Sequence, residues 1–231
     1  ENLLLSGNLS VTSDSAIALG NLTADAVLTL SSNMDVSSAE LTLSDSAELS
    51  LGTANITAYV TNPVIVDSTQ KLKNGGGSFD FAGGITLKSG SELVGQGQEI
   101  SGNISLSGGK LSIAQDTIFA DNLAISAGST INIDALKTLT YDGATVGIGA
   151  AVLKIQGGGT FINTESTELK LNSANSNLVL DNVTVAYVSV SAASNSNKGL
   201  QVTADSTLTN LSLTQKLRLS VAAEKTFSVT E

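Results

Sequence analysis

The feature that most constrains this chain is a short step of two apolar residues flanking one polar residue, repeated along nearly the whole sequence. It occurs at Leu9/Val11, Leu28/Leu30, Leu41/Leu43, Ile85/Leu87, Ile104/Leu106, Leu123/Ile125, Leu169/Leu171 and Leu211/Leu213. A period of two over so few residues is typical of short strands with one buried face. Apolar residues do not hold a long helical spacing anywhere in the sequence. The sequence therefore predicts an all-β chain.

The distance between these steps indicates how the strands are arranged. Successive steps follow one another more closely than the turn signals of sandwiches and barrels, which recur every ~8–12 residues. Such close spacing suits a coil of three short strands, roughly 20 to 24 residues per coil, stacked on similar neighbours. We expect residues 1–231 to form a single right-handed parallel β-helix (β-solenoid), a segment of a longer secreted protein. Stacking about ten coils would bury a continuous aliphatic column.

Asparagine repeatedly stands directly before an inward-facing strand. The predicted corner residues are Asn8, Asn21, Asn55, Asn103, Asn122, Asn182 and Asn210. Asparagine tolerates the left-handed backbone that a sharp corner needs, and stacked amides can hydrogen-bond along the axis of the coils. These residues are expected to be structural.

A second recurring element places Asp or Gly before Ser or Thr between two apolar residues. It appears as Leu87-Lys-Ser-Gly-Ser-Glu-Leu93, Ile125-Ser-Ala-Gly-Ser-Thr-Ile131 and Val202-Thr-Ala-Asp-Ser-Thr-Leu208. Both Asp and Gly suit a tight turn, for different reasons. Two glycine triplets, 75–77 and 157–159, each precede a hydroxyl residue and a Phe. Their separation is close to four coils of the inferred size, so we interpret them as equivalent corners.

Composition excludes several classes of function. The chain has no Cys, no His and no Trp, and aromatic residues make up 3%. Disulfide scaffolds, Cys/His metal sites and histidine bases are therefore excluded. The net charge is −10, and most of it lies in residues 1–70, which contain no Lys or Arg. Such a field repels phosphate, so nucleic acid is not expected as a partner. The apolar runs are too short for direct membrane insertion.

Several residue patterns resemble catalytic or metal sites. Residues 75–80, Gly-Gly-Gly-Ser-Phe-Asp, approximate a calcium-binding repeat, but Ser78 replaces a required Gly and the copy is single. Ser107 and Lys110 match a Ser-x-x-Lys nucleophile, whose helical geometry the intervening glycines oppose. Asp121, Asp134 and Asp181 are candidate carboxylates for glycoside chemistry, which needs a pair ~5–9.5 Å apart. In each case the sequence favours a turn or corner role, and we expect no catalytic residue, metal or cofactor.

Ice binding is a further alternative, because flat solenoid faces can present ranks of threonine. Thr-x-Thr pairs occur at 138/140 and at 207/209, but not in successive coils. The sequence therefore predicts no regular plane of hydroxyl groups.

The stretches SGNLSV, LKSGSELV, SAGSTINI, NGGGSF and TADSTLTNLSL resemble the β-helical regions of bacterial surface adhesins, including autotransporter passengers and filamentous-haemagglutinin-like proteins. This resemblance extends over essentially the whole chain. It implies a secreted or cell-surface, elongated and non-enzymatic stalk or adhesive rod, and it transfers no catalytic residue.

The expected function is that of an extracellular structural or adhesive β-solenoid module of a bacterial surface protein or filament. The expected partners are further copies of the chain, associated end to end or laterally, or glycans and proteins of a host or surface. The alternative is a β-helix protein that binds or cleaves polysaccharides.

Overall fold

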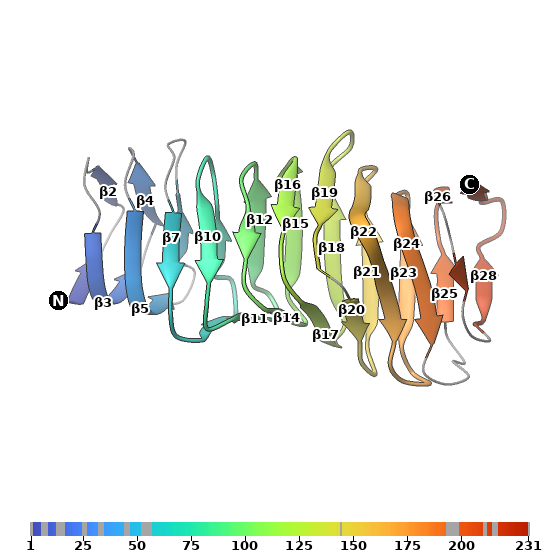
Figure 1. The fold of residues 1–231 in the computed structure, drawn as a ribbon, viewed down its shortest axis with the longest axis horizontal. Helices are drawn as coiled ribbons and strands as arrows, with labels where there is room; N and C mark the ends of the chain where they lie inside the picture. Colours follow the sequence, from blue (N-terminus) through green and yellow to red (C-terminus); the bar gives the residue numbers. More distant parts are fainter. Residues whose placement is uncertain are drawn as a thin grey trace.

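A computed structural model describes residues 2–5, 9–12, 17–24, 27–31, 35–43, 47–51, 57–143, 145–192, 199–209, 212–213 and 217–230. Within these ranges the regular elements are all β-strands, and the pairings between named strands are all parallel. The strands stack side by side along one axis, with the two chain termini at opposite ends (Figure 1). No helix that could span a membrane occurs in the described part of the chain. The predicted all-β parallel solenoid is confirmed.

Each coil contributes strands to three faces. Four long strands run through the corner between the first and second faces: β3 (Ile17–Ala24), β5 (Asp35–Leu43), β22 (Thr160–Leu171) and β24 (Thr184–Ala192). The first face also contains β7 (Thr57–Val60), β10 (Ser78–Phe81), β13 (Ile100–Ser101), β16 (Thr117–Phe119), β19 (Thr138–Tyr141), β26 (Ser206–Thr209) and β29 (Phe227–Thr230).

The second face also contains β1 (Asn2–Leu5), β8 (Val64–Val66), β11 (Ile85–Lys88), β14 (Ile104–Ser107), β17 (Leu123–Ala127), β20 (Thr145–Ile148) and β27 (Ser212–Leu213). The third face is a separate 11-stranded sheet of β2 (Leu9–Thr12), β4 (Val27–Ser31), β6 (Glu48–Ser50), β9 (Lys71–Lys73), β12 (Glu92–Gln96), β15 (Lys110–Gln115), β18 (Ser129–Ile133), β21 (Val152–Gln156), β23 (Asn177–Asp181), β25 (Gly199–Val202) and β28 (Leu219–Val221).

The register on the third face shows that the coils are unequal in length. Leu93 of β12 pairs with Leu111 of β15, which closes a short coil. Ile155 of β21 pairs with Leu180 of β23, which closes a distinctly longer one. The coils therefore vary slightly more in length than the sequence predicts. Strand lengths must match for pairing, so the difference is taken up at the corners.

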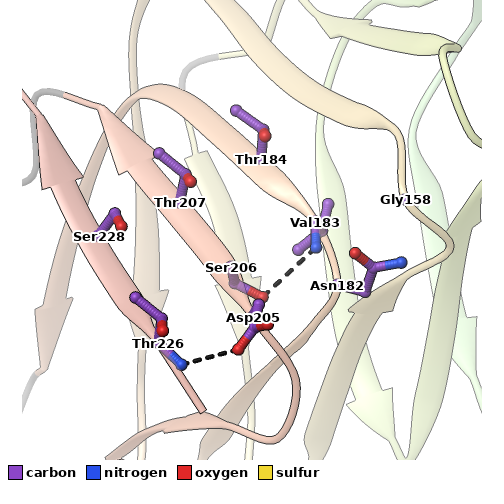
Figure 2. A pocket seen from close by; sticks show the side chains of 9 residues that line it. All are labelled: Gly158, Asn182, Val183, Thr184, Asp205, Ser206, Thr207, Thr226 and Ser228. Carbon is purple, nitrogen blue, oxygen red and sulfur yellow. Dashed lines mark hydrogen bonds between the residues drawn. The ribbon is translucent and has the colours of Figure 1, made fainter.

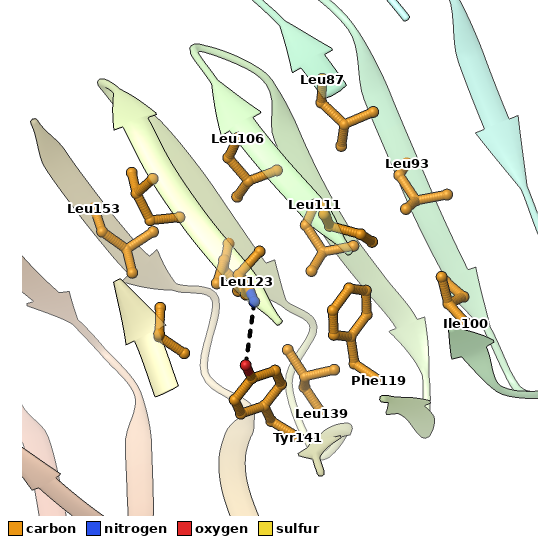
Figure 3. Close-up of a cluster of buried hydrophobic side chains, with 14 of the residues drawn as sticks. Leu87, Leu93, Ile100, Leu106, Leu111, Phe119, Leu123, Leu139, Tyr141 and Leu153 are labelled. Atoms are coloured by element: carbon orange, nitrogen blue, oxygen red, sulfur yellow. Dashed lines mark hydrogen bonds between the residues drawn. The ribbon is translucent and has the colours of Figure 1, made fainter. Parts of the chain in front are cut away.

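The core is built from the apolar steps that the sequence displays. On the second face, each of β11, β14 and β17 buries its first and third residues, so that one apolar pair per strand points inward. The few aromatic residues are mostly inside: Phe79, Phe81, Phe119, Tyr141 and Phe161 are the largest fully buried side chains. Stacking places the rings of Phe119 and Tyr141 6.0 Å apart, and those of Tyr141 and Phe161 6.0 Å apart. Figure 3 shows this aliphatic and aromatic column.

The two glycine triplets occupy the same corner, between the third and first faces. Residues 75–77 follow β9 and residues 157–159 follow β21, and four coil steps lead from β9 through β12, β15 and β18 to β21. Their equivalence as corners is confirmed. The two Phe residues are not equivalent, however, because register places Phe79 in the column of Tyr141 and Asn163, whereas Phe161 pairs with Leu139.

The outer side of the third face carries alternating charges in neighbouring coils. Glu92 contacts the Nζ atoms of Lys71 at 3.3 Å and Lys110 at 3.0 Å, and its Oε1 accepts a hydrogen bond from Ser112. Partial burial acts to raise the pKa of Glu92, but the Ser112 hydrogen bond and the two ammonium groups outweigh it and hold the pKa below its usual value. Opposite charges on adjacent strands favour this register over a shifted one.

Candidate functional site

Buried hydroxyl groups tie neighbouring coils together at the corners. Ser129 Oγ donates to the carbonyl of Ala127 at 2.9 Å and accepts the N–H of Gly108, in the preceding coil, at 3.0 Å. Thr117 makes the same two bonds: it donates to the nearby carbonyl of Gln115 and accepts the N–H of Gly97 in the preceding coil. Ser206 likewise donates to the carbonyl of Ala204 and accepts the N–H of Val183 in the preceding coil. The recurring Ser or Thr is therefore a link between coils as well as a turn former.

At two of these corners an aspartate directly precedes the hydroxyl residue, as Asp116-Thr117 and Asp205-Ser206, and its side chain bonds in the opposite direction along the stack. Asp116 Oδ1 accepts the N–H of Thr138 at 2.8 Å, and Asp205 Oδ1 accepts the N–H of Thr226 at 2.8 Å. In both cases the donor is one coil further on. Asp116-Thr117 and Asp205-Ser206 thus each join three successive coils. At Gly128-Ser129 the glycine has no side chain for the second link, and Ser129 makes the bond to the preceding coil.

Replacing Ser129 by alanine should lower the free energy of unfolding by about 1–3 kcal/mol, because the partly buried N–H of Gly108 loses its acceptor. The matched control is Ser126→Ala in β17, where an exposed hydroxyl makes only a 3.5 Å contact with the Leu106 carbonyl. That change should stay within about 0.5 kcal/mol. Chemical denaturation followed by circular dichroism measures both values. Equal effects of the two substitutions would contradict the proposed link.

The predicted corner asparagines can be placed for part of the chain. Asn103 and Asn122 lie directly before β14 and β17, and Asn122 Nδ2 donates to Asn103 Oδ1 at 3.1 Å, which links adjacent coils. The left-handed backbone at these corners belongs to the preceding residues, Gly102 (φ 102°) and Asp121 (φ 74°). Asn182, by contrast, has a φ of 55° itself.

The other predicted corner residues are Asn8, Asn21, Asn55 and Asn210. The backbone of Asn21 lies within β3, where it pairs with Asn2 and Glu40. Asn8, Asn55 and Asn210 lie outside the described residues, and their corner role stays a prediction.

The carboxylates considered for glycoside chemistry are each engaged in local contacts. Asp121 Oδ2 accepts the N–H of Gly102 at 2.8 Å, Asp134 Oδ1 accepts from Asn132 Nδ2 at 2.9 Å, and Asp181 forms an ion pair with Lys154. Asp80, from the calcium-like stretch, lies in β10 beside Tyr59 and Ser101 of the adjacent strands. Within the described residues no group of three or more acidic side chains could hold a metal ion.

A polar groove of about 300 Å³ lies across three coils near the C-terminal end of the first face. Its polar side chains come from the starts of β24, β26 and β29 and from the corners that precede them: Asn182, Thr184, Asp205, Thr207, Thr226 and Ser228. Figure 2 shows them in two rows, with Thr184, Thr207 and Ser228 in one and Asn182, Asp205 and Thr226 in the other. This groove is the candidate functional site.

The row of hydroxyl groups is longer than the groove. Register aligns one hydroxyl residue from each of five successive coils, in the order Thr138, Thr160, Thr184, Thr207 and Ser228. These five residues form one regular rank of hydroxyl groups, which the sparse Thr-x-Thr pairs of the sequence did not indicate. In the neighbouring column, Ile162 and Ala186 interrupt the hydroxyl groups, so a regular two-dimensional plane is absent, as the sequence predicts.

Sequence reasoning missed the column because it searched for Thr-x-Thr pairs. The signal was one hydroxyl residue at the first or second position of the first-face strand in each of these five coils, and the changing coil length concealed it. No family model, curated protein or solved structure matches the chain. Functional interpretation therefore depends on the geometry of the molecule itself.

Proposed function

We propose that the chain is an extracellular structural or adhesive module of a bacterial surface protein or filament, and that it has no catalytic role. The observation that carries the proposal is the uninterrupted stacking of parallel strands around one core. Leu72, Leu93, Leu111, Ile131 and Ile155 occupy one column of the third face, and each is fully buried. A protein of this form acts through its length and stiffness and through the surface it displays.

Stiffness follows from how each coil is bonded to its neighbours. Backbone hydrogen bonds run along the axis on all three faces, and the corner hydroxyls of Thr117, Ser129 and Ser206 add side-chain bonds between coils. Bending the stack would stretch these bonds on one side and compress the packed core on the other. Close-packed protein interiors resist such deformation.

The stiffness can be tested with two spin labels. The chain has no Cys, so Ile65→Cys and Leu136→Cys, both at exposed positions, give a uniquely labelled pair. Double electron–electron resonance should give one narrow distance distribution that does not change with salt. The same doubly labelled protein, unfolded in concentrated urea, gives a broad distance distribution for comparison. A broad distribution under native conditions would mean that the chain is no rigid spacer, and the proposal would fail.

Association with further copies of the chain is part of this proposal. Leu219 and Val221 of β28 are 45% and 41% exposed, although their register partners Leu200 and Val202 are buried. Contact with a second copy through these side chains would remove them from water. Sedimentation velocity should then show oligomers that increase with protein concentration.

Polysaccharide binding is a second candidate, favoured by the polar groove on the first face. Cleavage lacks comparable support, because Asp205 is the one carboxylate among the groove residues and glycoside hydrolysis uses two. A reducing-sugar assay separates the two activities, and we expect no release of sugar ends.

A further inference from the structure

We propose that the groove across β24, β26 and β29, together with Tyr187, binds a neutral linear glycan. This inference rests on the proposed adhesive function and deepens it by naming a ligand class for the surface. Three observations support it: the repeat of polar pairs in the groove, the absence of a cationic side chain among the described residues that line it, and an exposed aromatic residue on one of its strands.

The polar pairs repeat from coil to coil. Thr184, Thr207 and Ser228 are direct register partners, and a polar residue lies two positions before each: Asn182, Asp205 and Thr226. Stacked strands are ~4.8 Å apart, so the groove presents a ladder of paired polar groups along the axis of the coils. A polymer of similar units, running along this axis, can contact successive pairs in the same way.

The chemistry of the groove selects a neutral ligand rich in hydroxyl groups. Hydroxyl side chains both donate and accept, amides do the same through two separate groups, and a carboxylate accepts. Asp205 uses Oδ1 to accept the N–H of Thr226, and a carboxylate has further capacity to accept from a ligand hydroxyl. Among the described residues that line the groove there is no Lys or Arg, and the one charged group is the carboxylate of Asp205. Anionic polymers are therefore disfavoured.

Tyr187 supplies an apolar platform on β24, the strand that also carries Thr184. Its side chain is 54% exposed, and its φ is 56°. A bulky residue rarely adopts this backbone conformation, and such outliers gather at functional sites. The Tyr187 N–H donates to Thr209 Oγ1 at 3.3 Å, which holds the bend against β26. An exposed ring held in this way can stack on the apolar face of a sugar.

The broken second column favours a glycan over ice. Ice recognition requires a regular array in two dimensions, and Ile162 and Ala186 interrupt the column beside the threonine rank. A single polymer chain needs only one ladder. The groove also contains a second row of polar side chains, including Asn182 and Asp205, beside the row of Thr184 and Thr207. A flat ice-binding plane would not use this second row.

The test is retention of the full chain on an array of neutral linear glucans, mannans, xylans and galactans, with alginate as the anionic reference. We expect retention on at least one neutral glycan, little change with added salt, and none on alginate. Thr184→Val/Thr207→Val should weaken retention about tenfold, because each lost hydrogen bond contributes roughly 0.5–1.5 kcal/mol. Tyr187→Ala should weaken it about fivefold through lost stacking.

The matched control is Thr86→Val/Thr130→Val, which removes two outward hydroxyls from the second and third faces and should leave retention unchanged. Valine is a strong strand former, so both double variants are expected to fold, and circular dichroism checks this. Equal loss in the two double variants, or no retention of the wild type by any neutral glycan, would overturn the proposal. Inhibition of ice growth without glycan retention would also overturn it.

The experiments distinguish a failure of the glycan-binding proposal from a failure of the proposed structural function. A narrow spin-label distance distribution with no glycan retention leaves the rigid rod in place and removes only the ligand.

Discussion

Replacing Tyr141 by alanine should lower the free energy of unfolding by about 3–5 kcal/mol, the range for deleting a large buried aromatic side chain. The ring is fully buried and stacks between those of Phe119 and Phe161. Loss of Tyr141 would therefore leave a cavity that separates two aromatic neighbours in adjacent coils. Urea denaturation followed by circular dichroism measures the change.

The hydroxyl of Tyr141 contributes separately from its ring. It donates to the carbonyl of Thr145 at 2.9 Å. It also accepts the N–H of Leu123 at 3.2 Å, the bond drawn in Figure 3. Tyr141→Phe keeps the ring and removes both bonds, so it should cost about 1–3 kcal/mol. The difference between the two variants then gives the contribution of the ring.

Because the Tyr141 hydroxyl is buried, we expect the free energy of unfolding to change with pH in the alkaline range. Burial raises the pKa of Tyr141 to about 12 from its ordinary value of 10.0, the Leu123 N–H lowers it in part, and the charge of Asp121 raises it further. When folding raises the pKa of a group, the contribution of that group to the stability of the protein is complete at pH values below the pKa in the unfolded state. The contribution is lost as the pH rises towards the pKa in the folded state. The advantage of wild type over Tyr141→Phe should therefore shrink between about pH 10 and 12.

Tyr187→Ala is the matched control, because it removes the same side chain from an exposed position. Its effect on unfolding should stay within about 0.5 kcal/mol, while its effect on glycan retention should be large. A Tyr141→Ala variant as stable as Tyr187→Ala would show that the aromatic column does not contribute to the core as described.

The sequence predicted the architecture because the alternation of residues determines which face is buried. Ile85/Leu87, Ile104/Leu106 and Leu123/Ile125 were recognised as inward steps, and all of these side chains are buried in register. Parallel stacking followed from the short spacing of such steps. These predictions depend on local pattern alone, and local pattern is visible without the register.

The candidate site depended on register, which the sequence does not display. Coils of unequal length shift equivalent positions unevenly, so the alignment of Thr184 with Thr207 could not be counted from a fixed period. The corner asparagines illustrate the same limit. At Asn103 and Asn122 the side chains link two coils, but the left-handed backbone lies one residue earlier, where the sequence shows Gly in one coil and Asp in the next.

Gly102→Ala should lower the free energy of unfolding by about 3 kcal/mol or more, although it adds a single methyl group. Gly102 has a φ of 102°, and a Cβ there would lie 2.2 Å from the carbonyl oxygen of Phe81 in the preceding coil. A non-glycine residue in this conformation costs about 1–3 kcal/mol, and relieving the clash requires backbone of two coils to move, at a further ~1–3 kcal/mol. The Gly102 N–H bond to Asp121 Oδ2 would be disturbed as well.

Gly128→Ala is the control, because a Cβ at Gly128 would meet nothing within 4 Å. It should leave stability unchanged or raise it by up to about 1 kcal/mol, since alanine restricts the unfolded chain. Thermal and urea denaturation of both variants give the comparison. The pairing of Ile104 with Leu123 aligns Gly102 with Asp121, whose φ is 74°, so the same corner accepts a side chain one coil later. Similar stabilities for the two variants would mean that the corner at Gly102 can also relax to the Asp121 geometry, and that coil corners adapt independently of one another.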